Sequence, residues 1–235
     1  MDDKIIDDLK NLDTLSDGTP HTNTLACHLL YYLVSSLDKP EVLELACGFG
    51  KATIYLAAAA KRQGGFLRSN DLSEFLWKGQ SVKDLLAKSN LSDVCEITFN
   101  KDARWYLLDL LRGKPMFWID LAYLDLSHTV EVDSFVALAL WTHLRPGGII
   151  AFDDLDWVPM DYGYTKNVAE PTKSNVQIIF NYIGNLPDVG QNAIWGHEEI
   201  GWRIGLLQKR TLEYNKLDLL DLIQQFNTLH VRQKI

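Results

Sequence analysis

The order in which apolar runs alternate with helical patterns is the feature that most constrains the fold. Short apolar runs at 42–45 and 117–124 are each followed by a longer stretch with helical spacing, at 52–62 and 130–143. This alternation is typical of βαβ units, in which crossover helices join parallel strands. The chain is therefore predicted to form an α/β domain around a doubly wound, mostly parallel sheet.

Strand and helix positions follow from this alternation along the chain. Strands are predicted at 42–45, 65–70, 95–99, 117–124 and 149–152, with two more near 193–195 and 202–207. Helices are predicted at 1–16, 24–37, 52–62, 76–89, 106–112, 130–143, 174–183 and 212–227, with a sharp turn at 145–148. Residues 1–40 are expected to form an N-terminal helical segment (a lid or an oligomer contact), 41–210 the main domain, and 211–235 a C-terminal helix.

Charge and composition narrow the possible partners and location. The net charge of −8 repels phosphate backbones, and no stretch gathers Lys and Arg into a basic stripe, so a small-molecule partner is favoured over nucleic acid. No apolar run approaches the roughly 20 residues that span a bilayer, and the N-terminus is acidic where a secretory signal is basic. Cys27, Cys47 and Cys95 lack metal-binding spacing, which favours a reducing cytoplasm.

The segment 44–50 (Glu-Leu-Ala-Cys-Gly-Phe-Gly) joins the strand at 42–45 to the following helix. Its glycines permit a tight turn and a close approach to a ligand. A P-loop would need Gly at position 45 and Ser or Thr at 52, but the chain has Leu45 and Ala52. A dinucleotide fingerprint would need Gly where Thr53 stands. Both phosphate-binding motifs are therefore disfavoured.

The string Val-Leu-Glu-Leu-Ala-Cys-Gly-Phe-Gly at 42–50 resembles the first motif of class I S-adenosylmethionine-dependent methyltransferases. That motif is an acidic residue in the strand followed by a glycine loop. The resemblance implies that Glu44, Ala46, Gly48 and Gly50 bind the cofactor, with Ala46 standing where the family commonly has Gly. A tight turn that binds no ligand is the competing interpretation.

Two acidic residues follow the next two predicted strands. In the family, a carboxylate after the second strand holds the ribose hydroxyls, and residues after the third contact the adenine; the resemblance assigns these roles to Asp71 and to Asp102 with Ala103. S-adenosylmethionine carries a sulfonium and an ammonium but no phosphate, so an acidic pocket suits it and would repel a pyrophosphate. One such acid alone is more often a solvated loop residue.

The segment 119–128 (Ile-Asp-Leu-Ala-Tyr-Leu-Asp-Leu-Ser-His) resembles a subgroup with the pattern Phe-Asp-x-x-Phe-x-Asp-x-x-His. This subgroup contains small-molecule O-methyltransferases related to the macrocin and cephalosporin-pathway enzymes. As in the subgroup, Leu-x-Pro-Gly-Gly at 144–148 and a strand ending in two acids at 152–154 follow, although Leu126 replaces the usual Gly. The resemblance covers 41–154 and 201–206, and it implies a seven-stranded, Rossmann-like methyltransferase sheet over 41–210.

The acids of this segment are expected to bind a metal ion. Asp125, Asp153 and Asp154 end adjacent predicted strands, and Mg²⁺ prefers carboxylate oxygens. Mg²⁺ would make an acceptor hydroxyl more acidic, and His128 would receive the proton, so Asp125 and His128 are the expected catalytic residues. The competing interpretations are that the paired acids cap a helix and that His128 is a cap or surface residue.

Several weaker candidates remain. His197, Glu198 and Glu199 could ligate a metal, although a solvated hairpin is the simpler interpretation. Four aromatic residues could line a substrate pocket or pack a loop: Trp157, Tyr162, Tyr164 and Trp195.

Three rival functions stay open. They are a metal-independent methyltransferase, a hydrolase on the same sheet, and a non-catalytic binding or scaffold subunit. The lack of a Gly-x-Ser-x-Gly motif disfavours the hydrolase.

Overall fold

One mixed sheet organises the molecule. The computed structural model describes residues 3–20, 22–113, 118–155, 174–197, 202–211 and 218–233. Its strands are β1 (Glu41–Leu45), β2 (Phe66–Asn70), β3 (Cys95–Thr98), β4 (Ile119–Leu124), β5 (Leu144–Phe152), β6 (Val189–His197) and β7 (Trp202–Lys209). Its helices are α1 (Asp3–Leu15), α2 (Thr24–Ser35), α3 (Lys51–Arg62), α4 (Val82–Lys88), α5 (Ala103–Gly113), α6 (Val130–His143), α7 (Asn175–Gly184) and α8 (Leu219–Gln233).

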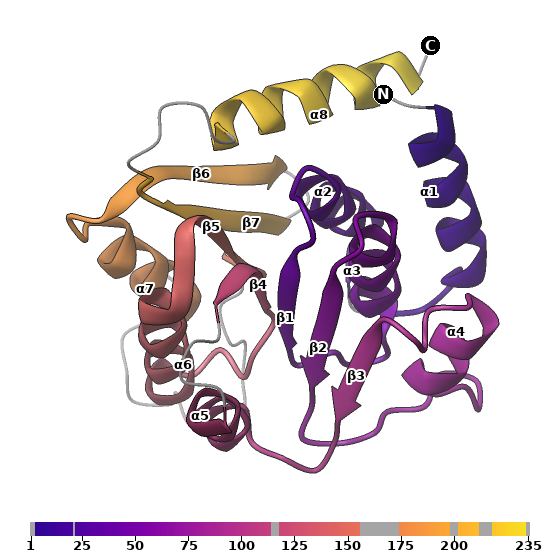
Figure 1. The fold of residues 1–235 in the computed structure, drawn as a ribbon, viewed down its shortest axis with the longest axis horizontal. Helices are drawn as coiled ribbons and strands as arrows, with labels where there is room; N and C mark the ends of the chain where they lie inside the picture. Colours follow the sequence, from indigo (N-terminus) through magenta and orange to yellow (C-terminus); the bar gives the residue numbers. More distant parts are fainter. Residues whose placement is uncertain are drawn as a thin grey trace, which may run out of the picture.

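The seven strands are ordered β3-β2-β1-β4-β5-β7-β6 (Figure 1). Strands β1 to β5 run parallel, whereas β7 lies antiparallel to both β5 and β6. The strand order therefore reverses between β1 and β4, where the chain returns from the outer strand β3. Ligands in doubly wound sheets bind beyond the carboxyl ends of the strands at such a reversal. The predicted fold class is confirmed.

Helices cover both faces of the sheet. Alternate residues of a strand point to opposite faces, so Val42 packs with α2 and α3 while Leu43 packs with α5 and α6. Because both faces are covered, β4 is buried along its whole length, which explains its nearly continuous apolar sequence. In Figure 1, α1, α2 and α3 lie on one side of β1, and α5, α6 and α7 lie on the other.

Helix α1 is held on α2 and α3 by hydrogen bonds to its acidic side chains. Asp8 accepts a hydrogen bond from the Tyr31 hydroxyl at 2.7 Å and pairs with Arg62 at 3.2 Å. Asp13 accepts a bond from the Tyr55 hydroxyl at 2.5 Å and lies 2.7 Å from Nε2 of His28. The acids that make the N-terminal segment polar in sequence therefore face inward at these two positions.

The predicted helix at 76–89 is wrong over its first turn. Trp77 and Gln80 bond to each other through their backbones, and the two residues between them, Lys78 and Gly79, have left-handed φ angles of 50° and 77°. Helix α4 begins only after Ser81, whose hydroxyl accepts a hydrogen bond from the backbone N–H of Asp84, and the Asp84 carboxylate accepts one from the Ser81 N–H. This capping box sets the start of the helix.

Two other boundaries differ from the expected ones. The predicted turn at 145–148 belongs to β5, where the register against β4 shifts between Ile119 and Leu121 and Gly147 has a φ of 84°. The last helix begins at Leu219, after the non-helical Asp218, and the predicted start at Leu212 lies outside the described residues. Within the described parts of the chain, no helix is both long and apolar enough to cross a membrane.

Candidate active site

The loop between β1 and α3 turns through three residues in the left-handed region. The φ angles are 69° for Ala46, 53° for Gly48 and 84° for Gly50. A Cβ on Gly50 would overlap the side chain of Val82, so this position needs glycine for space as well as for its φ angle. Ala46 stands where the resemblance places a glycine, and its left-handed φ angle carries a conformational cost for alanine.

Replacing Ala46 by Gly should therefore stabilise the protein. A left-handed alanine costs about 1–2 kcal/mol, and the extra freedom of an unfolded glycine offsets about 0.5–1 kcal/mol, so we expect a net gain of roughly 0.5–1 kcal/mol. Urea unfolding measures the change. The matched control is Ala58→Gly within α3, which should lose about 1 kcal/mol because glycine disfavours a helix. A loss of stability in Ala46→Gly would contradict the prediction.

Glu44 lies fully buried beneath this loop. Its Oε2 atom accepts hydrogen bonds from Thr53 in α3 at 2.8 Å and from Ser69 in β2 at 2.6 Å. Its Oε1 atom has no hydrogen-bond partner in the described part of the chain. Burial raises the pKa of Glu44 to about 7, the two hydroxyl bonds act in the opposite direction, and repulsion from Asp71 adds to the increase.

Asp71 and Asp102 lie at the ends of β2 and β3, as the sequence predicted. Asp71 is buried, and its carboxylate accepts hydrogen bonds from the backbone N–H groups of Gly48 at 2.7 Å and Ser73 at 3.2 Å. Asp102 pairs with the guanidinium of Arg104 at 2.8 Å, and this hydrogen-bonded pairing holds the pKa of Asp102 below its usual value. Asp71 thus supports the glycine loop directly, a contact that sequence reasoning did not include.

One cavity of about 200 Å³ connects these loops. It is lined by Ala46, Asn70, Asp71, Leu72, Asp102, Ala103, Leu126, Ser127 and Val132. Ligand pockets usually measure about 300–1,000 Å³, so this cavity has room for part of a cofactor-sized molecule. The apolar wall formed by Leu126 and Val132 was not predicted, although the replacement of the usual Gly by Leu126 is a visible signal for it.

Asp125, His128 and Asp154 converge at the ends of β4 and β5. Their potential ligand atoms all lie within 4.8 Å of one another, and Nε2 of His128 is 3.4 Å from a carboxylate oxygen of Asp154. Burial raises the pKa of Asp125 well above its usual value, and repulsion from Asp153 and Asp154 raises it further. Both His128 and Asp154 have left-handed φ angles, 57° and 53°.

The group of possible ligands contains His128 in place of Asp153, so the predicted set of three aspartates stays a prediction. The Asp153 side chain is buried and turned toward the Tyr123 hydroxyl, which donates a hydrogen bond to Oδ2 at 2.5 Å. Its Oδ1 atom accepts a hydrogen bond from the backbone N–H of Asp154 at 3.0 Å. The structure thus groups the ligand atoms of Asp154, and not those of Asp153, with Asp125 and His128.

Sequence reasoning also missed Asp133, in the first turn of α6. Burial raises its pKa to about 6, while the nearby His128 and a hydrogen bond from Ser127 at 3.3 Å oppose the increase. An acid in the first turn of a helix ordinarily indicates only a favourable helix start. Its position beside His128 depends on the tertiary structure.

Of the remaining candidates, Trp195 is the one whose side chain the structure describes. Trp195 packs against Phe226 of α8 with ring centroids 5.3 Å apart, and its indole N–H donates to Asn227 at 2.7 Å, so it supports α8. The side chain of His197 lies outside the described part of the chain. The other aromatic and metal candidates also lie outside it: Trp157, Tyr162, Tyr164, Glu198 and Glu199.

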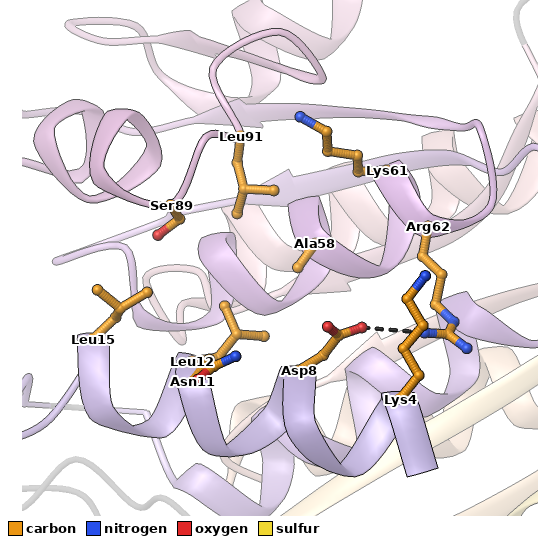
Figure 2. A pocket seen from close by; sticks show the side chains of 10 residues that line it. All are labelled: Lys4, Asp8, Asn11, Leu12, Leu15, Ala58, Lys61, Arg62, Ser89 and Leu91. Carbon is orange, nitrogen blue, oxygen red and sulfur yellow. Dashed lines mark hydrogen bonds and ion pairs between the residues drawn. The ribbon is translucent and has the colours of Figure 1, made fainter. Parts of the chain in front are cut away.

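A second cavity lies under α1, away from the strand ends. It measures about 480 Å³, and Figure 2 shows the ten side chains that line it, from α1, α3 and the residues after α4. The Asp8–Arg62 ion pair crosses one end of this cavity. No predicted site residue lines it.

Solved structures with the same architecture include several proteins that are named as methyltransferases. A cofactor-bound protein from MTB, Rv0187, is 19% identical with a TM-score of 0.61, covering 89% of this chain and 91% of that one. The O-methyltransferase TomG from Streptomyces achromogenes is 15% identical (TM-score 0.62, 87% and 90% covered), and an O-methyltransferase from Bacillus cereus is 17% identical (TM-score 0.62, 89% and 92% covered). No curated protein sequence matches the chain.

The sheet order and the loops at its carboxyl edge define a Rossmann-like methyltransferase fold. Residues 43–155, which run from β1 through Asp154, match the family described as a methyltransferase domain. The segment that contains the predicted cofactor loop and the acids at the strand ends thus resembles a methyltransferase domain.

Proposed function

We propose that this protein transfers a methyl group from S-adenosylmethionine to a hydroxyl of a small molecule, with Mg²⁺ bound beside the acceptor. One observation carries the proposal: the acidic cavity beside the glycine loop adjoins the carboxylate–imidazole cluster, through the segment that contains Asp125, Leu126, Ser127 and His128. A cofactor in the cavity would therefore present its methyl group toward Asp125 and His128.

The cofactor-binding residues would be Glu44, Ala46, Gly48, Gly50, Asp71, Asp102 and Ala103. Acidic groups around the cavity favour the positively charged sulfonium and ammonium groups of S-adenosylmethionine. The structures of TomG with S-adenosylmethionine and of the Bacillus cereus enzyme with its demethylated product support this choice of cofactor.

The donor set at the strand ends fits a hard divalent cation. Asp125 and Asp154 offer oxygen ligands, which Mg²⁺ prefers to an imidazole, so these two carboxylates would hold the ion. When bound, Mg²⁺ would supply Lewis-acid polarisation of the acceptor oxygen.

His128 would accept the proton of the acceptor hydroxyl. Nε2 would take this proton, and the Asp154 carboxylate, 3.4 Å from Nε2, would stabilise the ring once it is protonated. A hydroxyl acceptor is further supported by the resemblance of 119–128 to the macrocin and cephalosporin-pathway subgroup and by the role of TomG in tomaymycin synthesis.

Calorimetric titration with S-adenosylmethionine, with and without Mg²⁺, tests the proposal. We expect micromolar dissociation, about −7 to −8 kcal/mol, in both conditions. Methyl transfer that continues in excess chelator would favour the metal-independent mechanism, and cofactor binding without any transfer would favour a scaffold subunit. Absence of binding at millimolar ligand would refute the proposed cofactor.

Asp71→Ala should weaken cofactor binding by about 1.5–3 kcal/mol, because it removes a charged acceptor from the cavity and frees the Gly48 N–H. The same titration measures the loss. The control is Asp93→Ala, which removes an exposed acid paired with Lys61 far from the cavity and should leave binding unchanged. Equal affinity in the two variants would remove Asp71 from the site.

A further inference from the structure

The two side chains that meet at the strand ends, His128 and Asp154, both stand on left-handed backbone. Non-glycine residues in this region cost free energy and persist only where the surrounding structure holds them. A left-handed Asp154 aims its carboxylate away from the direction that a continuing strand would give it. Whatever holds the backbone of Asp154 therefore also sets the position of its carboxylate.

The contacts of Asp153 supply such a restraint. Its Oδ1 atom accepts a hydrogen bond from the Asp154 N–H at 3.0 Å, and its Oδ2 atom accepts one from the Tyr123 hydroxyl at 2.5 Å. Tyr123 belongs to β4, the neighbouring strand, and lies two residues before Asp125. One carboxylate thus links the backbone of Asp154 to the strand that carries Asp125.

The surroundings of this link make it rigid. Tyr123 is 1% exposed and Asp153 is 3% exposed, so neither side chain can exchange its partner for bulk water. The Tyr123 hydroxyl therefore keeps the Asp153 carboxylate as its acceptor inside the protein.

We propose that Tyr123 is a positioning residue, which acts through Asp153 to hold the Asp154 carboxylate where it can share a divalent cation with Asp125. Asp153 is then a support for the cation site and is not a ligand. This inference rests on the proposed metal dependence. It deepens that proposal, because it predicts which of the two adjacent acids touches the ion.

The test measures Mn²⁺ binding by the loss of the free-ion electron paramagnetic resonance signal, without cofactor or substrate. Tyr123→Phe removes only the hydroxyl, and we expect it to weaken Mn²⁺ binding about 10–100-fold, the usual effect of losing a group that orients a ligand. The matched control is Tyr31→Phe, which removes another buried hydroxyl that donates to a carboxylate, that of Asp8. It should leave Mn²⁺ affinity unchanged. Unchanged or tighter binding in Tyr123→Phe would overturn the proposal.

A second variant separates support from ligation, and it carries the test if Tyr123→Phe does not fold. The amide in Asp153→Asn can still accept from the Asp154 N–H and can donate to the Tyr123 oxygen, so Mn²⁺ affinity should fall by less than about tenfold. Asp125→Asn should lower the Mn²⁺ affinity far more than Asp153→Asn does. Equal losses in the two Asn variants would make Asp153 a ligand and overturn the inference.

The parent protein separates this inference from the proposed function. No Mn²⁺ binding by the parent would refute the cation site and this inference together, while calorimetry with S-adenosylmethionine would still judge the cofactor proposal.

Discussion

His128→Ala should lower methyl-transfer turnover by about 10²–10⁴-fold, the usual contribution of a positioned general base. The imidazole lies at the cluster where the acceptor hydroxyl is proposed to bind, with Asp154 at 3.4 Å on one side and the buried Asp133 nearby. Cofactor affinity should stay nearly unchanged, because His128 does not line the cavity beside the glycine loop. Single-turnover kinetics with saturating cofactor measures the chemical step.

His128→Asn is the sharper variant. Asparagine tolerates the left-handed φ of 57° better than alanine does, so the turn should keep its shape while the proton acceptor is lost. The matched control is His143→Ala at the other end of α6, which should turn over like the parent. Normal turnover in His128→Asn would show that His128 only shapes the turn. Lost Mn²⁺ binding in the same variant would make His128 a metal ligand in place of a base.

The stability of the cofactor-free protein should fall as the pH rises through the titration of Glu44. The pKa of Glu44 is raised from 4.5 to about 7 in the folded protein, so between these values the folded state binds more protons than the unfolded state. Ionised Glu44 therefore opposes folding. The loss in the free energy of unfolding begins at about pH 4.5. It is complete above pH 7, where it is on the order of 3 kcal/mol.

Glu44→Gln should remove this pH dependence. The amide oxygen can accept from Thr53 and Ser69, and the amide N–H₂ replaces the unbonded Oε1 at a cost that does not change with pH. Urea unfolding should show that the stability of the variant relative to the parent increases by about 2.5 kcal/mol from pH 5 to pH 8. Glu131→Gln, at an exposed position of α6, should follow the parent at both pH values. A constant difference between Glu44→Gln and the parent would contradict the raised pKa.

The sheet and the edge where ligands approach it follow from the amino-acid sequence. Strands buried on both faces must be apolar throughout, and crossover helices must show a helical period, so the alternation predicted β1 to β5 and the helices between them. Parallel strands end at one edge of a sheet, so acids that follow successive strands must gather there. For this reason the sequence alone places Asp71, Asp102 and Asp125 at the correct edge of the sheet.

Local backbone geometry decided what the sequence pattern left open. The sequence shows two adjacent acids after β5, and only the structure shows that Asp154, on left-handed backbone, is grouped with Asp125 and His128. Likewise, the turn between Trp77 and Gln80 overrides the apparent helix start before α4.

Contacts between distant segments decided the rest. The partnership of Tyr123 with Asp153 joins residues 30 positions apart, and Asp71 meets Gly48 across 23 positions. The spacing of apolar residues predicts which face of a strand or helix is buried. It does not predict which polar groups of two elements contact each other. These contacts depend on strand register and on the direction of each side chain. Both are fixed only when the sheet and its helices pack together.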